Sequence, residues 1–473
     1  MSIPPLNAAA REFGLAPVTL PSYTVPVEEP RVPPAVYEAR VAAALERASA
    51  AGLDALLVYG DREHFANIAY LTGFDPRWEE MLLILVPGRT PVLLAGNESM
   101  AYADAVQIEV EVVRFAKFSL VGQPDPEQLS LADAFGIAGF SAGATPRLGT
   151  VGWKFWETPG YEQWIELPAF IVDELRAAGF TLSNANALFT GYTAAGPGLR
   201  LVNEVDQIAA FEFAACHSSE SLRRMITAVT PGQTELEASR LYEATLLPFS
   251  YHPTLLSGER AGYGVASPSG RMLAVGDPMS AGFGHWGSNS ARGGFLVESA
   301  SQLPAGAEDY VAALVAPYFA AAVAWYETIR VGVTAGELYA AVHAVLDDPF
   351  YGVYLNPGHH IHLDEWPSSP VAPGSPVEFV SGMALQLDII PATGTVYGSS
   401  NVEDGIVLAD AELRASLAEA YPEAWERILA RRAFLASLGI TLDESVLPMS
   451  NIAGWLPPYW LAPHLAMRRL GAS

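Results

Sequence analysis

The sequence predicts a protein of two parts, an α/β unit followed by an α+β unit. Strand and helix patterns alternate from Val36 to Gly152, which is typical of an α/β arrangement. The pattern changes near Leu199, and residues 204–229 then form one long amphipathic repeat that ends before Pro231. The chain has 473 residues, of which 51% are hydrophobic and 16% charged, so it is long enough for about two to three domains with a large core.

The first part is expected to alternate between helices and buried strands. Apolar residues recur at helical spacing up to Ala51, and Gly52 follows as a stop signal. Residues 1–34 are rich in proline and aperiodic, so we expect an extended arm that lies on the body of the protein or on a neighbour. The expected elements are helices over 36–51 and 168–178, strands over 54–59, 81–86 and 91–95, and a short element over 67–74.

The second part is expected to mix helices with short strands. Residues 252–300 are rich in glycine, serine and aromatic residues and predict strands and loops. The uncharged run over 310–326 is short for a membrane span and contains Pro317, so a buried core helix is expected. The expected helices cover 204–229, 235–245, 308–329, 335–346 and 412–438, and the expected strands cover 383–390 and 402–408.

Charge and cysteine content restrict the partners and the compartment. The net charge of −26 argues against nucleic acid and anionic membranes, because both require basic patches. The first residues carry neither the basic nor the apolar region of a secretory signal. Cys216 is the single cysteine, which excludes an intrachain disulfide. We therefore expect a cytoplasmic protein without nucleic acid or membrane partners, and the acidity names no substrate.

One segment, from Asn356 to Pro367, concentrates groups that can do chemistry. It holds a third of the chain's nine histidines: His359, His360 and His362. Asp364 and Glu365 follow, and a Pro-Gly turn opens the segment, which predicts a tight loop. Such a cluster can bind a metal ion, transfer protons or form a buried hydrogen-bonded network. A polar surface loop is the alternative, although Trp366 favours partial burial.

Two motifs stand out in the first part, Asp54-Ala-Leu-Leu-Val and Asn67-Ile-Ala-Tyr-Leu-Thr-Gly-Phe74. The second part carries, in order, Asn203-Glu204, Val229-Thr-Pro-Gly-Gln-Thr-Glu235, Gly276-Asp277, Pro357-Gly-His359, Ser381-Gly-Met383 and Val402-Glu403-Asp404. This ordered set resembles the motifs of the creatinase/aminopeptidase P/prolidase superfamily. The first two motifs resemble its N-terminal domain, and the others resemble its catalytic domain, which has the pita-bread fold.

The resemblance implies a domain order. The expected parts are an N-terminal arm over 1–35, a creatinase-like α/β domain over 36–198, a pita-bread domain over 199–412 and a C-terminal helical extension over 413–473. The pita-bread domain is a curved antiparallel sheet covered by helices.

The resemblance also implies a degenerate metal site. In the metallopeptidases of the superfamily, two aspartates, one histidine and two glutamates hold a pair of divalent ions. His359, Asp388 and Glu403 match the histidine and the two glutamates, whereas the neutral Ser280 and Asn289 stand where the aspartates are expected. We therefore expect no two-metal centre and no cofactor. A single Zn, Mn or Fe ion on His359, Asp388 and Glu403 is the alternative.

Other residues are expected near this site. His285 and His362 are additions to the family pattern. The histidine that the peptidases carry ahead of the first active-site strand is absent, and Tyr263 is the nearest polar group. Trp366 falls near the position of another family histidine. Because a neighbouring subunit's N-terminal domain helps to close the site in the family, the resemblance implies a homodimer, with Arg77 as a candidate for that contact.

A histidine between two carboxylates is an acid/base device, since one carboxylate fixes its tautomer and the other can bind a cationic or amide N–H group. The expected catalytic residues are His359, Asp388, Glu403, His285 and His362, and the expected substrate-binding residues are Asn289, Ser280, Tyr263, Arg77 and Trp366. We expect a creatinase-like hydrolase that cleaves a C–N bond of a small polar substrate. The alternatives are a metal-dependent Xaa-Pro aminopeptidase or dipeptidase with variant ligands, and a non-catalytic homologue that binds a ligand or partner.

Overall fold

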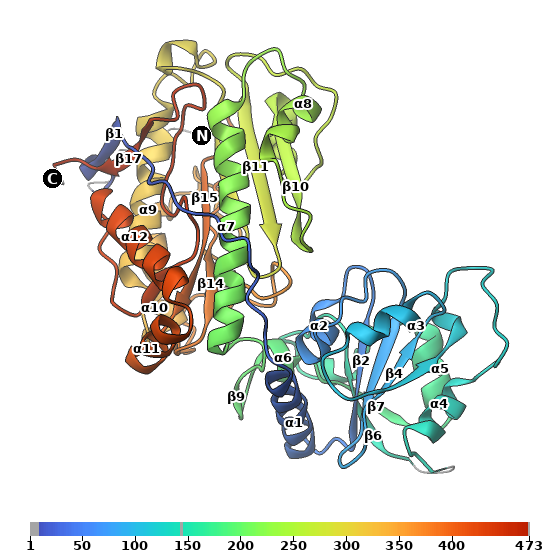
Figure 1. Ribbon diagram of the computed structural model, residues 1–473. Helices are drawn as coiled ribbons and strands as arrows, with labels where there is room; N and C mark the ends of the chain where they lie inside the picture. The colour runs from blue at the N-terminus through green and yellow to red at the C-terminus, as the bar shows by residue number, and fades with distance from the viewer. Residues whose placement is uncertain (1–8, 142–144, 472–473) are drawn as a thin grey trace. The chain divides into compact units, whose positions relative to one another are not determined.

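The structure is a computed structural model that describes residues 9–141 and 145–471. The described chain separates into two compact units (Figure 1). Residues 32–202 form the N-terminal unit. The residues before and after this stretch come together in a second unit, which we call the C-terminal unit.

The N-terminal unit is a mixed six-stranded sheet with helices, in the strand order β5-β4-β3-β2-β6-β7. Strands β2, β6 and β7 are parallel, whereas β3 runs antiparallel to both of its neighbours. The strands are β2 (Ala55–Gly60), β3 (Met81–Leu85), β4 (Val92–Ala95), β5 (Glu111–Arg114), β6 (Arg147–Val151) and β7 (Thr181–Asn184), and a hairpin of β8 (Tyr192–Thr193) and β9 (Gly196–Pro197) follows. The α-helices are α1 (Pro34–Ala50), α2 (Ala66–Thr72), α3 (Ser99–Tyr102), α4 (Leu131–Ile137), α5 (Ala169–Ala177) and α6 (Ala187–Thr190).

The central strands of this sheet are apolar along their whole length because both faces are covered. Every residue of β2 and β3 is buried. Their side chains pack with Phe115, Phe135 and Ile171 in one core cluster. Complete burial of each large side chain contributes about 1.5–3 kcal/mol. This explains why uninterrupted apolar runs, rather than alternating ones, predicted these strands correctly.

The C-terminal unit is built on a seven-stranded antiparallel sheet in the order β10-β11-β12-β15-β14-β13, with β16 paired to β15. It is the curved antiparallel sheet covered by helices that the resemblance implied, and the long helix α7 packs along β11 (Figure 1). The strands are β10 (Phe249–Ser257), β11 (Pro278–His285), β12 (Ser290–Phe295), β13 (His359–His360), β14 (Ala384–Leu387), β15 (Asn401–Leu408) and β16 (Val446–Pro448). The α-helices are α7 (Val205–Ala228), α8 (Glu235–Ser239), α9 (Ala316–Thr328), α10 (Ala335–Leu346), α11 (Ala411–Ala420) and α12 (Pro422–Ser437).

Prolines divide two of the expected helices. The helix expected over 308–329 begins with a π-helical stretch, Val311–Val315, and becomes α-helical only at Ala316. Pro317 has no backbone N–H to donate, and the wider turns before it accommodate its ring. Pro422 ends α11 and starts α12, because proline suits the first turn of a helix.

The apolar helix around α9 is a core helix. Val311–Thr328 is long and apolar enough to cross a membrane, with a mean hydropathy of 1.2 over 18 residues. Within the protein, 72% of that window is buried. A mostly buried core helix passes the same test of length and composition, and the prediction of a buried helix is confirmed.

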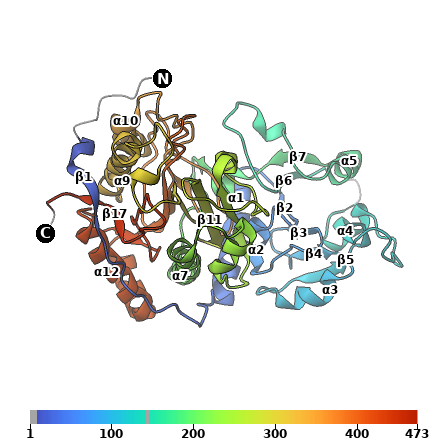
Figure 2. The same ribbon diagram turned by 90° about the horizontal axis from the view of Figure 1, so that it is seen from above.

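The two ends of the described chain meet in a short sheet that the sequence did not reveal. Strand β1 (Phe13–Pro17) pairs antiparallel with β17 (Leu465–Arg469), and Figure 2 shows the two strands side by side. The pairing joins segments at opposite ends of the sequence, and no local pattern predicts such a contact. The C-terminal residues therefore form part of the C-terminal unit through β16 and β17.

Candidate functional site

A constrained turn places the histidine loop. Gly358 has a φ of +122°, and a Cβ at this position would lie 2.8 Å from the carbonyl oxygen of Gln386, so the position requires glycine. The Trp325 indole N–H donates to the carbonyl oxygen of Pro357 at 2.8 Å. Directly after the turn, His359 pairs with Gln386 across β13 and β14. The turn and the ladder together fix the start of the loop.

His359 is fully buried and has a neighbour at each ring nitrogen. Its Nδ1 lies 2.8 Å from the carbonyl oxygen of His360 and donates to it, because a carbonyl oxygen only accepts. Its Nε2 forms an ion pair with Glu365 Oε1 at 3.1 Å, and Asp388 Oδ2 lies 3.9 Å away. Trp366 stacks on the ring with 4.0 Å between centroids and 18° between planes.

Two further strands bring carboxyl groups to His359. Asp388 follows β14 directly, and Glu403 lies on β15 opposite Ala291. The ligand atoms of His359, Asp388 and Glu403 lie within 4.8 Å of one another, which makes these residues a candidate ligand set for one metal ion among the residues that the structure describes. Asn289 donates from its side-chain amide to Glu403 Oε1 at 2.9 Å.

Burial and mutual repulsion keep protons in this cluster. Burial raises the pKa of Asp388 to about 6, although His359 opposes the shift. Burial, together with the neighbouring Asp388 and Glu365, raises the pKa of Glu403 well above its ordinary value. Burial alone would lower the pKa of His359, but Glu365 and then Asp388 more than offset this and raise it. Two carboxyl groups in one place with raised pKa values can act as proton donor and acceptor.

A cavity of about 1020 Å³ opens beside the cluster within the C-terminal unit. Its wall includes the carboxyl groups and the neutral residues expected at the site: Ser280, Asn289, Glu365, Trp366, Asp388 and Glu403. Tyr251 also lines it, and burial raises the pKa of this tyrosine to about 12. The cavity is large enough for a small organic molecule.

Comparison with known proteins agrees with this architecture. Residues 40–146 match the family described as the Creatinase/Prolidase N-terminal domain. The dipeptidase PepE from Mycobacterium ulcerans is similar in structure, with a TM-score of 0.58 and 22% identity over 80% of this chain and 95% of that one. The chain therefore has the fold of these proteins, and its residues 40–146 are similar to the Creatinase/Prolidase N-terminal domain.

Two other solved structures resemble this chain to a similar degree. The prolidase from Pyrococcus horikoshii gives a TM-score of 0.57 at 18% identity and covers 78% of this chain and 95% of its own. The X-Pro aminopeptidase from Thermotoga maritima gives a TM-score of 0.60 at 13% identity, with coverages of 78% and 95%. At these identities the likeness concerns the fold. No match was found among curated proteins.

The two other histidines expected at the site contact aromatic side chains of the C-terminal unit. His285 is buried and stacks on Phe249 at 5.4 Å, and burial lowers its pKa to about 4. His362 is buried with its ring edge-on to Phe211 at 5.2 Å. Neither histidine lines the cavity in the described part of the chain.

Tyr263 and Arg77 also lie outside the cavity wall as described. Tyr263 is 61% exposed, although its neighbours Gly262 and Gly264 line the cavity. Arg77 belongs to the N-terminal unit, where it forms an ion pair with Asp75 at 3.2 Å. Its guanidinium group also lies over the ring of Phe65, 3.9 Å from the centroid.

Glu365 is the residue that sequence reasoning noticed but did not assign to the site. It lies in an irregular loop, and no periodicity fixes where such a side chain points. His359 itself lies behind the wall, covered by Trp366 and paired with Glu365. The sequence Asp364-Glu365-Trp366-Pro367 could have indicated that Glu365 belongs to the site, because it places an acidic pair just before an aromatic residue in a short loop.

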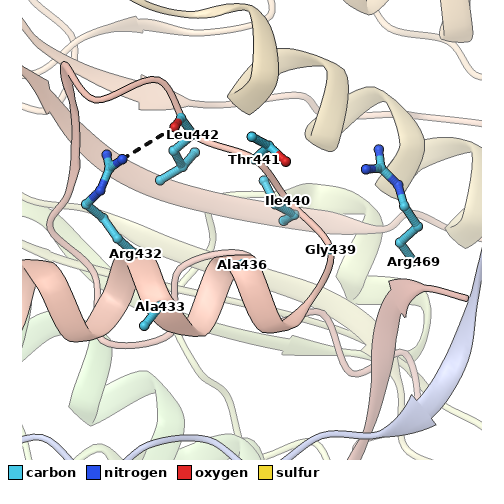
Figure 3. A pocket seen from close by; sticks show the side chains of 8 residues that line it. All are labelled: Arg432, Ala433, Ala436, Gly439, Ile440, Thr441, Leu442 and Arg469. Carbon is cyan, nitrogen blue, oxygen red and sulfur yellow. Dashed lines mark hydrogen bonds between the residues drawn. The ribbon is translucent and has the colours of Figure 1, made fainter. Parts of the chain in front are cut away.

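A second, smaller hollow of about 480 Å³ lies beside the C-terminal end of α12 (Figure 3). Two arginines line it, and both already have partners. Arg432 donates to the carbonyl oxygens of Leu442 and Asp443, and Arg469 pairs with Glu327 at 3.3 Å. Both guanidinium groups already bind other groups of the protein. The cavity at Asp388 and Glu403 is therefore the better candidate site.

Proposed function

We propose that this protein is a hydrolase that cleaves a C–N bond of a small polar substrate, peptide-like or amidine-like, without a two-metal centre. The observation that carries the proposal is the meeting of Asp388 and Glu403 on the wall of a large cavity, with His359 and Glu365 beside them. Perturbed titratable groups in a cavity are typical of an active site. The dipeptidase, prolidase and aminopeptidase that share the fold are enzymes named for C–N bond cleavage.

The donor set does not fit two metal ions. Two divalent ions bring four positive charges, which bridging carboxylates must balance. At the positions where the resemblance implies aspartates, the cavity wall has Ser280 and Asn289, which are neutral. The Asn289 amide donates its N–H to Glu403, and its remaining oxygen carries no charge that could balance a second divalent ion. We therefore infer that the reaction uses side-chain acid/base chemistry.

The carboxyl groups of Asp388 and Glu403 have different roles in the proposed reaction. Asp388, whose pKa burial raises to about 6 against the opposing effect of His359, removes a proton from the water that attacks the carbon of the C–N bond. Glu403, whose pKa burial and then the neighbouring Asp388 raise well above its ordinary value, gives its proton to the departing nitrogen. Asp388 gains a proton from the water, and Glu403 loses one to the departing nitrogen. Transfer of a proton from Asp388 to Glu403 then returns both groups to their starting states. Asn289 orients Glu403 through its amide.

Turnover by conservative variants tests this proposal. Full-length wild type, D388N and E403Q are assayed with a panel of dipeptides, small amides and amidines. Each substitution should lower kcat/KM about 10²–10⁴-fold, the usual contribution of a general acid or base. E298Q, at an exposed position outside the cavity wall, is the matched control. Activity that survives in both D388N and E403Q would contradict the proposal.

A single-metal Xaa-Pro peptidase is the second candidate function, and the compact set of His359, Asp388 and Glu403 favours it. One histidine and two carboxylates can bind Zn, Mn or Fe. In that case turnover should disappear on chelation and return when one equivalent of metal is added. Activity that persists in a chelator would exclude it.

We further propose a cytoplasmic homodimer in which the N-terminal unit of one copy, including Arg77, helps to close the cavity of the other. The family resemblance motivates the assembly, and the buried free thiol of Cys216 suits a reducing compartment. Sedimentation of the full-length protein tests the dimer. A monomer with full activity would exclude a contribution from a second copy.

A further inference from the structure

A buried carboxylate that the proposed reaction does not use anchors a loop of the cavity wall. Glu235 begins α8 and is fully buried. Its Oε1 accepts hydrogen bonds from the backbone N–H and the hydroxyl of Ser257, both at 2.8 Å. Its Oε2 accepts from the backbone N–H and the hydroxyl of Ser269, at 2.9 and 2.6 Å. These two serines flank residues 258–268, so one carboxylate joins both ends of this stretch, which we call the 258–268 loop.

Arg260 extends this anchor into the loop. Its Nε donates to Glu235 Oε2 at 3.1 Å, and its Nη2 donates to the carbonyl oxygen of Ser267 at 2.8 Å. The guanidinium group lies 5.8 Å from the centroid of the Tyr263 ring. Hydrogen bonds to an ionised carboxylate are about twice as strong as those between neutral groups. The base of the loop is therefore held firmly, from Glu235 through Arg260.

The tip of the loop is held less firmly, although it borders the cavity. Gly262 and Gly264 line the cavity, and a Cβ at either position would meet no described atom within 4 Å. Tyr263 and Val265 are each 61% exposed. The exposed side chain of His252 donates from Nε2 to the carbonyl oxygen of Val265 at 2.8 Å, a bond that water can replace. The tip therefore has both space to move and side chains to bury.

We propose that the 258–268 loop is a lid on the cavity and that Glu235 is the positioning residue that anchors it. With the base fixed, the tip moves over a bound substrate, and Tyr263 then contacts that substrate. A loop that closes in this way holds the substrate in its reacting orientation. The inference rests on the proposed function for its substrate. It also gives a structural reason for the binding role expected of Tyr263, whose side chain is exposed in this arrangement of the loop.

Amide hydrogen exchange of the full-length protein tests the anchor without any substrate. Wild type, E235Q, R260M and E298Q are compared by mass spectrometry of peptides from the 258–268 loop. Exchange there should be about tenfold faster in E235Q and R260M, because each loses bonds to the base of the loop, whereas peptides of α7 should be unchanged. E298Q, which removes an exposed carboxylate outside the cavity wall, should match wild type. Exchange in the loop at the wild-type rate in both variants would overturn the inference.

Steady-state kinetics tests the lid. With the panel compound that wild type hydrolyses fastest, E235Q and Y263A should raise KM by about fivefold or more and leave kcat within about threefold, because the loop binds the substrate and transfers no proton. A lower kcat at unchanged KM, or wild-type kinetics in both variants, would overturn the inference. If circular dichroism shows that E235Q does not fold, R260M takes its place. Turnover by D388N and E403Q decides the proposed function, whereas amide exchange is measured without substrate, so the two can fail separately.

Discussion

Removal of the Asp404 carboxylate tests how the C-terminal segment is held to the sheet that carries the site. Asp404 and Arg292 are both fully buried, and Arg292 Nη2 lies 3.0 and 2.9 Å from the two carboxylate oxygens. Arg292 also donates to the carbonyl oxygens of Trp455 at 2.7 Å and Ile452 at 2.6 Å. The ion pair therefore joins β12, β15 and the tail.

The expected cost follows from what the substitution leaves behind. D404A strands a buried guanidinium group, which costs about 3–5 kcal/mol. It also removes the acceptor for Gly454 N, 3.0 Å from Asp404 Oδ2, which contributes about 1 kcal/mol. The double variant R292M/D404A removes the stranded charge, so it should be less destabilised than the sum of the single variants.

Urea unfolding, followed by circular dichroism and by the fluorescence of the buried Trp455 and Trp460, measures these differences. E426A, at an exposed position of α12, is the control and should change the free energy of unfolding by less than about 0.5 kcal/mol. A loss below about 1 kcal/mol in D404A would refute the reasoning. Strictly additive single and double variants would refute it as well, since a coupled pair is non-additive.

Three further outcomes are expected. G358A should destabilise the protein by about 1–3 kcal/mol in urea unfolding, because alanine is strained at a φ of +122° and would contact Gln386; an unchanged midpoint would count against the turn argument. W366A should lower kcat/KM and alter the imidazole NMR shifts of His359, since the stacked ring covers it; unaltered shifts would disprove that contact. Burial raises the pKa of Asp75 to about 6 against the opposing effect of Arg77. The stabilisation from its protonated form is thus complete below about pH 4 and is lost as the pH rises through about 6, a change of up to about 3 kcal/mol that D75N should abolish. Equal pH slopes in wild type and D75N would contradict this assignment.

The sequence predicted the strands and helices whose signal is local. The apolar runs at 81–86 and 91–95 indicated buried strands, and the long repeat at 204–229 indicated a helix. The pairing of β1 with β17 was not predictable, because it depends on two chain ends meeting. Proline marked the breaks at 317 and 422, but whether a proline kinks or ends a helix depends on the packing around it.

Part of the site could be predicted, because the motifs that carry it are local in the sequence. Ordered motifs placed His359, Asp388 and Glu403 on neighbouring strands, and the structure brings them within 4.8 Å of one another. His285 and His362 were expected at the site as additions to the family pattern, and in the structure both contact aromatic side chains. Glu365 was not predicted as a site residue because it lies in an irregular loop. Only the folded loop shows that its carboxylate contacts the imidazole of His359.

Metal analysis of the purified full-length protein, with turnover measured before and after chelation, tests the central claim most directly. We predict that no pair of ions is tightly bound and that kcat/KM is the same after chelation. Two equivalents of tightly bound metal, with activity lost on chelation and restored by the added ion, would contradict it.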